Sequence, residues 1–167
     1  DVSTLELATD TDFPAPYAIH HATVTNHKIV SNRATPGPGI NHTLTTQTLA
    51  NGLGAGTITF ESGDNVTSGM GRVTFIQLGL GAGSVQTTTL NPTTANVSVG
   101  NVSKQIYDFP QTLGLGGATQ DNHVTGVISN GPALTGGNAV SVLKTGASTW
   151  TLSGANTYTG LTTVGAG

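Results

Sequence analysis

The sequence has no cysteine at all and very little charge. Without Cys, neither a disulfide framework nor a thiolate metal site can form. Only 8% of the residues are charged, against about 25% in an ordinary soluble domain. The five Lys and Arg residues are scattered and the net charge is −3, which disfavours a nucleic-acid-binding surface.

Long apolar runs and helix signals are missing as well. No segment approaches the ~20 apolar residues of a membrane helix, and no signal-peptide pattern is present. No window combines apolar residues at helical spacing with a cap and without glycine. Because the chain starts with Asp1 rather than Met, we expect a processed product or a segment of a longer polypeptide.

The composition that remains is rich in small and β-forming residues, with 24 Gly and 30 Thr among 167 residues. That length is sufficient for one domain with a real core. A disordered chain of this low hydrophobicity would carry far more charge. The composition therefore indicates β-structure with neutral outer faces, which tolerate close contact with copies of themselves.

The clearest pattern lies in residues 144–167. Three short segments alternate a hydrophobe with Thr or Ser, which is typical of strands with one buried face; they are Ser148–Leu152, Asn156–Tyr158 and Leu161–Val164. Gly154, Gly160 and Gly165 separate them and predict corners in which a positive φ carries no penalty. The alternation predicts that Trp150 and Tyr158 point into a core.

This stretch resembles the autotransporter-associated β-strand repeat, also called the passenger-associated transport repeat. The resemblance rests on KTG at 144–146, on SGANTYTG at 153–160 and on TTV at 162–164. Ser148 replaces the family's usual Gly, and Trp150 replaces the commoner Leu. The resemblance implies a right-handed parallel β-helix within a large secreted or surface protein of bacteria, but it implies no chemistry.

The rest of the chain divides at residue 40. Residues 1–40 read as an irregular N-terminal region, with a strand at Val2–Leu7, an acidic turn at Asp10–Asp12 and proline-bearing loops. Residues 41–167 read as β-helix coils that end in the 144–167 repeat. The strands expected there include Thr57–Phe60, Arg72–Leu80, Val85–Leu90, Ala95–Val99, Lys104–Phe109 and Ala139–Lys144, with a loop at Glu61–Gly71 and a turn at Gly100-Asn101.

The sequence thus predicts an all-β fold. A β-solenoid with coils of ~20–30 residues, stable only when stacked, would give about seven coils. A β-sandwich filament subunit, with strands every ~8–12 residues, is the alternative. The family resemblance favours the right-handed parallel β-helix.

One cluster could in principle hold a metal ion: His20, His21 and His27 with Asp10 and Asp12. Adjacent histidines on a strand point to opposite faces, and the spacing matches no metal motif. We therefore expect a structural role for these residues.

Other candidate motifs also have ordinary explanations. No Gly-x-Ser-x-Gly elbow is present, and the acidic pairs Asp10/Asp12 and Glu61/Asp64 lie in expected turns, where Asp commonly caps the backbone. The segment Gly79–Gly83 reads as a corner rather than a phosphate loop. Four glycosylation sequons begin at Asn41, Asn65, Asn96 and Asn101, as chance allows in such a chain. We expect no catalytic residue, no cofactor and no metal site.

The sequence favours a structural, non-enzymatic extracellular protein, part of a surface fibre, passenger or filament. Its expected partners are other copies of itself or the continuation of the same chain, with cell-surface glycans as a further candidate. The alternative function is a carbohydrate-binding or carbohydrate-active β-helix, which a line of exposed aromatics beside two carboxylates would favour.

Overall fold

A computed structural model describes residues 2–13, 16–21, 26–49, 56–81, 84–105, 109–131 and 139–166. These residues form strands, turns and connecting segments, and they contain no helix. Within them, accordingly, no helix is long and apolar enough to cross a membrane. The predicted all-β class is confirmed.

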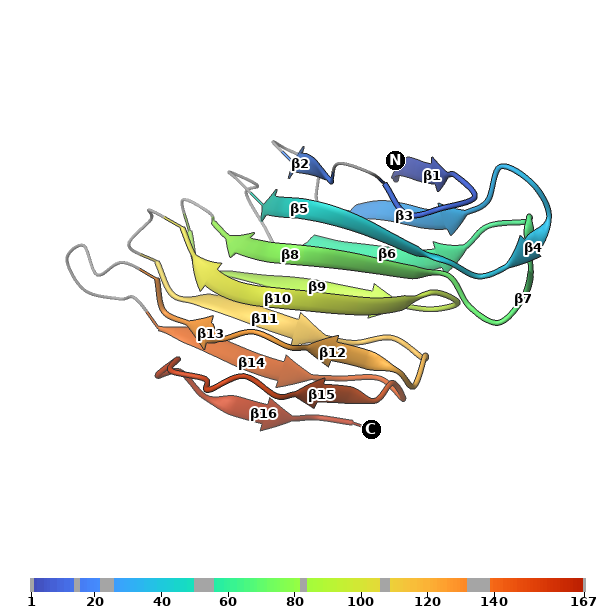
Figure 1. Cartoon of the computed structure of the whole chain (residues 1–167). Helices are drawn as coiled ribbons and strands as arrows, with labels where there is room; N and C mark the ends of the chain where they lie inside the picture. Colours follow the sequence, from blue (N-terminus) through green and yellow to red (C-terminus); the bar gives the residue numbers. More distant parts are fainter. Residues whose placement is uncertain are drawn as a thin grey trace.

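Two parallel sheets form the body of the molecule (Figure 1). The first sheet contains, in spatial order, β1 (Ser3–Ala8), β3 (Asn26–Asn32), β6 (Gly56–Ser62), β9 (Gln86–Pro92), β11 (Gln111–Leu115), β14 (Val140–Lys144) and β16 (Thr162–Val164). The second contains β15 (Trp150–Leu152), β12 (Asn122–Val124), β10 (Asn96–Lys104), β8 (Arg72–Leu80), β5 (Asn41–Leu49) and β2 (Tyr17–His21), and β13 (Ile128–Ser129) also pairs with β10.

The chain moves back and forth between these sheets, so that one strand from each makes a coil. β6 is followed by β8, and β9 by β10, and each strand pairs in parallel with its equivalent in the next coil. Parallel neighbours need a crossover rather than a tight hairpin, which is what each coil provides. The β-solenoid is therefore confirmed over the hairpin-linked sandwich, and strands on either side of residue 40 share the same two sheets.

Equivalent residues stack in columns along the solenoid axis. One inward column of the second sheet consists of Leu44, Phe75, Val99, Val124 and Leu152. Phe60 of the first sheet reaches across the interior to Phe75, with ring centroids 5.9 Å apart. Both phenylalanines are fully buried, so the centre of the core lies between β6 and β8.

The longer strands of the second sheet bend once. In β8 both Ile76 and Gln77 are exposed, although the residues on either side are buried. β10 bends at Gly100 and continues to Lys104 as one strand. The turn predicted at Gly100-Asn101, between Ala95–Val99 and Lys104–Phe109, is therefore wrong. The glycine serves close approach instead, because a methyl group there would lie 2.1 Å from the carbonyl oxygen of Ile76. Residues 106–108 lie outside the described part.

A third, two-stranded sheet projects from one corner of the solenoid (Figure 1). It pairs β4 (Gly37–Pro38) with β7 (Val66–Ser68), which lie on the connections from β3 to β5 and from β6 to β8. The loop predicted at Glu61–Gly71 therefore contains a short strand, because two long connections stack on each other. Arg72–Leu80, by contrast, is a strand over the range predicted.

Candidate functional site

The predicted His and Asp cluster is dispersed in the part of the chain that the structure describes. His27 is buried in β3, where its Nδ1 lies 2.7 Å from Ser3 Oγ. No three His, Cys, Asp or Glu residues of the described ranges are grouped so that they could hold a metal ion. His20 and His21 lie in β2, but their side chains are outside the description.

Asp10 instead joins the first coil to the second. Its Oδ1 accepts the backbone N–H of Thr35 at 3.0 Å, and its Oδ2 accepts the Thr35 hydroxyl at 2.9 Å. Arg33 Nη2 lies 3.3 Å from Oδ1. The hydrogen bonds from Thr35, helped by the Arg33 charge, hold the pKa of Asp10 below its usual value.

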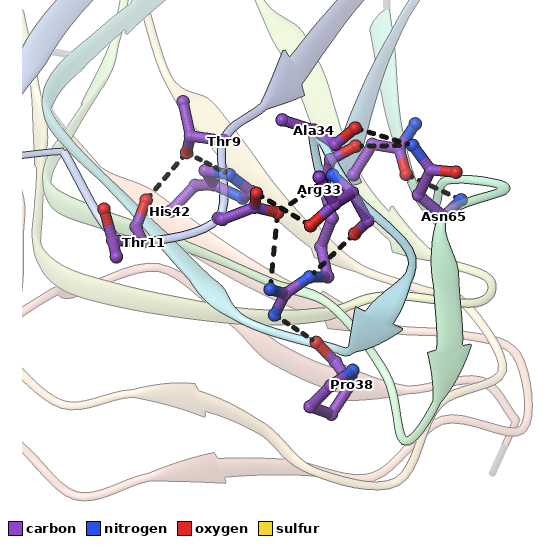
Figure 2. Close-up of polar contacts among 10 residues, drawn as sticks. Thr9, Thr11, Arg33, Ala34, Pro38, His42 and Asn65 are labelled. Atoms are coloured by element: carbon purple, nitrogen blue, oxygen red, sulfur yellow. Dashed lines mark hydrogen bonds and ion pairs between the residues drawn. The ribbon is translucent and has the colours of Figure 1, made fainter.

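Arg33 also fixes the connection on which β4 lies. Its Nε donates to the carbonyl of Thr35 at 3.1 Å, and its Nη1 donates to the carbonyl of Pro38 at 3.0 Å. The Nδ2 of Asn65, from the neighbouring coil, donates to the carbonyl of Arg33 at 2.9 Å (Figure 2). One guanidinium thus orders a whole turn through fixed, planar donors.

Asp12 makes a second clamp between the same coils. Its Oδ1 accepts the backbone N–H of Thr43 at 2.6 Å, and its Oδ2 accepts the Thr43 hydroxyl at 2.6 Å and Asn41 Nδ2 at 3.1 Å. Burial alone would raise the pKa of Asp12, but the hydrogen bonds from Thr43, Phe13 N–H and Asn41 outweigh it and lower the pKa.

His42 lies beneath this clamp and was not singled out by the sequence. Its side chain is fully buried, with Nδ1 2.9 Å from Ser31 Oγ and Nε2 3.1 Å from Thr9 Oγ1 (Figure 2). The Phe13 ring covers it at 5.3 Å. Burial lowers the pKa of His42, and the nearby Asp12 opposes that shift. The period-two spacing to Leu44 was the available signal that this histidine faces inward.

The second acidic pair does not converge on a common site. Glu61 forms an ion pair of 2.9 Å with Lys28 on the neighbouring strand, and Asp64 lies exposed in a turn. Two of the sequon amides form hydrogen bonds: Asn65 Nδ2 donates to backbone carbonyls, and Asn101 Oδ1 accepts the N–H of Val127 at 2.9 Å. Of the predicted corner Gly79–Gly83, Gly79 belongs to β8 and residues 82–83 are outside the description.

One charged cluster on the outer face of the second sheet was not foreseen. Asp121 binds Arg72 through Oδ2 and lies 2.6 Å from His123 Nε2 through Oδ1. The hydrogen bond from His123, with the charge of Arg72, lowers the pKa of Asp121. Arg72 and Asp121 are 49 residues apart, so no local sequence signal joins them. The side chain of Asp121 is 61% exposed, and the cluster is a surface ion-pair network.

The C-terminal stretch has the expected alternation at Ser148–Leu152 but not at Leu161–Val164, where all four residues are exposed. Thr149 and Thr151 are exposed, whereas Trp150 is half-buried against the core and donates through Nε1 to the carbonyl of Gly116 at 3.0 Å. The strand expected at Asn156–Tyr158 is wrong. The N–H groups of Thr157 and Tyr158 both donate to one carbonyl, that of Ile128, so the chain turns there.

The glycines of this stretch also act differently from expectation. Gly154 and Gly160 do not have a positive φ. A methyl group on Gly154 would lie 1.9 Å from the carbonyl oxygen of Gly126, and one on Gly160 would lie 2.4 Å from that of Val140. Close stacking on the coil before, rather than backbone conformation, is what requires Gly at these two corners.

Residues 142–167 match the family model described as passenger-associated-transport-repeat. The match agrees with the resemblance predicted for residues 144–167, and it covers the C-terminal end rather than the whole chain. No curated protein and no solved structure matches. The part of the chain from Val142 onward, which contains β15 and β16, is therefore similar to the passenger-associated transport repeat.

Proposed function

We propose that the chain is a structural, non-catalytic segment of a secreted or cell-surface protein, and that it associates through its strand edges. The observation that carries the proposal is a stack of parallel coils whose outermost strands, β1, β2, β15 and β16, pair on one side only within the described residues. The C-terminal repeat supports the location, because its family suggests a protein associated with an autotransporter passenger.

The C-terminal edge has the properties of a strand-pairing surface. No strand of the described residues pairs with the outer edge of β16 or of β15. Leu161 is 77% exposed and Val164 is 71% exposed, although Val164 continues the column of the interior residue Leu115. Open ladder groups beside exposed apolar side chains are a template for further β-structure.

The absence of catalysis is proposed from how the carboxylates are used. Asp10 and Asp12 accept backbone N–H groups, and Glu61 is paired with Lys28. Acidic groups held this way serve the fold, and the described residues show no line of exposed aromatics beside them. A glycan-cleaving β-helix is therefore the less supported candidate.

Sedimentation velocity and negative-stain microscopy of the purified chain, over a range of concentrations, test the proposal. We expect concentration-dependent oligomers or fibres, which Val164→Lys should suppress by placing a charge on the open edge. Val85→Lys is the matched control, because Val85 is 67% exposed but lies away from both ends. A monomer at every concentration would refute association, as would equal effects of the two variants.

A further inference from the structure

Ionisable side chains are concentrated at the junction between the first two coils. Three of the described acidic residues, Glu6, Asp10 and Asp12, lie in the first coil, and each accepts hydrogen bonds from the second. In addition, Nε2 of His42 in the second coil lies within hydrogen-bonding distance of Thr9 Oγ1 in the first coil. The later coils also have ionisable contacts, but these are the partly exposed ion pairs of Lys28 with Glu61 and of Asp121 with Arg72 and His123.

We propose that residues 2–13 form an acid-labile latch, which separates from β3 and β5 on acidification while the remaining coils stay folded. The proposal stands apart from the proposed function, because it concerns opening within one chain. It rests on three features: what the carboxylates bind, what covers His42, and how little apolar contact holds β1.

The carboxylates lose their partners when they are protonated. Both oxygens of Asp12 accept hydrogen bonds, from Thr43 and Asn41, and those of Asp10 accept from Thr35. A protonated carboxyl has one acceptor fewer and directs a donor at groups that are themselves donors. The charged group that faces Asp10 is Arg33, and it would lose its counter-charge.

The sign of the pH dependence follows from the pKa shifts. The pKa values of Asp10 and Asp12 are lowered by their contacts in the closed coil. Their contribution is therefore complete well above the ordinary pKa of 3.8, and it is lost as the pH falls below 3.8 through the lowered pKa values. The open state binds more protons, so acid favours opening.

His42 adds to the effect at higher pH. It is fully buried under Thr9 and Phe13, and burial lowers its pKa from 6.5, with Asp12 as the opposing charge. Separation of residues 2–13 would uncover the ring and let it accept a proton. The stability that its neutral form gives to the closed coil is thus present above pH 6.5 and declines below it.

Little apolar surface resists the separation. Of the six residues of β1, Leu7 alone is buried. A cavity of about 340 Å³ remains between β1, β2 and β5, lined by Leu5, Leu7, Phe13, Tyr17, Ile19 and Leu44. Elements with few buried apolar contacts open first, so the ionisable contacts decide whether this coil stays closed.

Hydrogen exchange followed by mass spectrometry at pH 7 and pH 3, with times scaled for intrinsic exchange, tests the latch. We expect the opening constant of Ser3–Ala8 to rise by at least about tenfold, since each proton taken up contributes up to tenfold per pH unit. The protection of β8 and β10 should not change. The double variant D10N/D12N should open at pH 7 and respond less to acid.

The matched control is E61Q/D121N, which removes two carboxylates from later coils and should leave β1 as it is in the unaltered chain. Three outcomes would overturn the proposal. They are equal protection of β1 at both pH values, loss of protection throughout the chain together, and a full acid response in D10N/D12N. Because all the measurements are made on dilute monomer, failure of the association proposal would not affect the result.

Discussion

The first coil and the C-terminal repeat are held to their neighbours by different chemistry. At the first coil, Asp10 and Asp12 accept backbone N–H groups from the next coil. At the repeat, amide oxygens do the same work: Asn130 Oδ1 accepts the N–H groups of Val140 at 3.0 Å and Thr159 at 3.1 Å. Both solutions satisfy the donors of a turn stacked on another turn.

The difference matters because an amide oxygen is an acceptor at every pH, whereas a carboxylate changes on protonation. Lys144 is the one charged side chain in the described residues 139–166. Its Nζ donates to the carbonyls of Thr145 and Gly146 at 2.8 Å, and burial lowers its pKa. A single solenoid thus has one end that is clamped by carboxylates and another whose described residues, 139–166, contain none.

The largest loss of stability should come from a substitution in the hydrophobic core that both ends share. Phe75→Ala removes a fully buried ring that packs on Phe60, and we expect a loss of about 3–5 kcal/mol in the free energy of unfolding. Ile76→Ala, at the exposed neighbour, should stay within about 0.5 kcal/mol. Urea denaturation measures both, and a loss confined to one end would show that the ends are not coupled through this core.

The neutral end can be weakened and then made pH-dependent. Asn130→Ala leaves the N–H groups of Val140 and Thr159 without their acceptor, which should cost about 1–3 kcal/mol equally at pH 7 and pH 4. Asn130→Asp keeps the acceptor and should lose stability in acid only. Emission of Trp150, the one tryptophan, follows the urea transition. The comparison fails if Asn130→Asp responds to acid no more than the unaltered chain.

Exposed charge should contribute least to stability. The Lys28–Glu61 pair is about one-third exposed on both sides, so Glu61→Gln should cost no more than about 0.2–1 kcal/mol. Added salt should reduce even that cost. Thermal unfolding with and without salt measures it, and a loss above about 2 kcal/mol would mean that carboxylates matter in every coil and not at the first alone.

The tryptophan emission maximum is expected not to change with pH. The half-buried Trp150 lies in the neutral repeat, so its emission maximum should be the same at pH 7 and pH 4 in the unaltered chain. Steady-state fluorescence provides the test. A red shift over the pH range in which β1 opens would place an acid-sensitive step at the C-terminal end as well.

Alternation and glycine spacing were enough to predict the strand Arg72–Leu80 and the all-β class. The C-terminal repeat was predicted from its resemblance to a known family. They could not predict the Asp12–Thr43 clamp, because its partners are 31 residues apart and come together only through the register of the coils. For the same reason the ion pair between Arg72 and Asp121 could not be predicted. The inward position of His42 was visible in the alternation, but its partners lie on other strands.

Coil length is not constant, although most neighbouring strands pair without a shift in register. The sequence offset between paired residues is 24 from Ser3 to His27, 32 from Gly56 to Thr88 and 20 from Val142 to Thr162. The extra residues are taken up in the connections, as in the turn that forms β4 and β7. Insertions and deletions at these corners can therefore create new surface loops in the course of evolution. The paired strands, and with them the cross-section of the following coils, would not change.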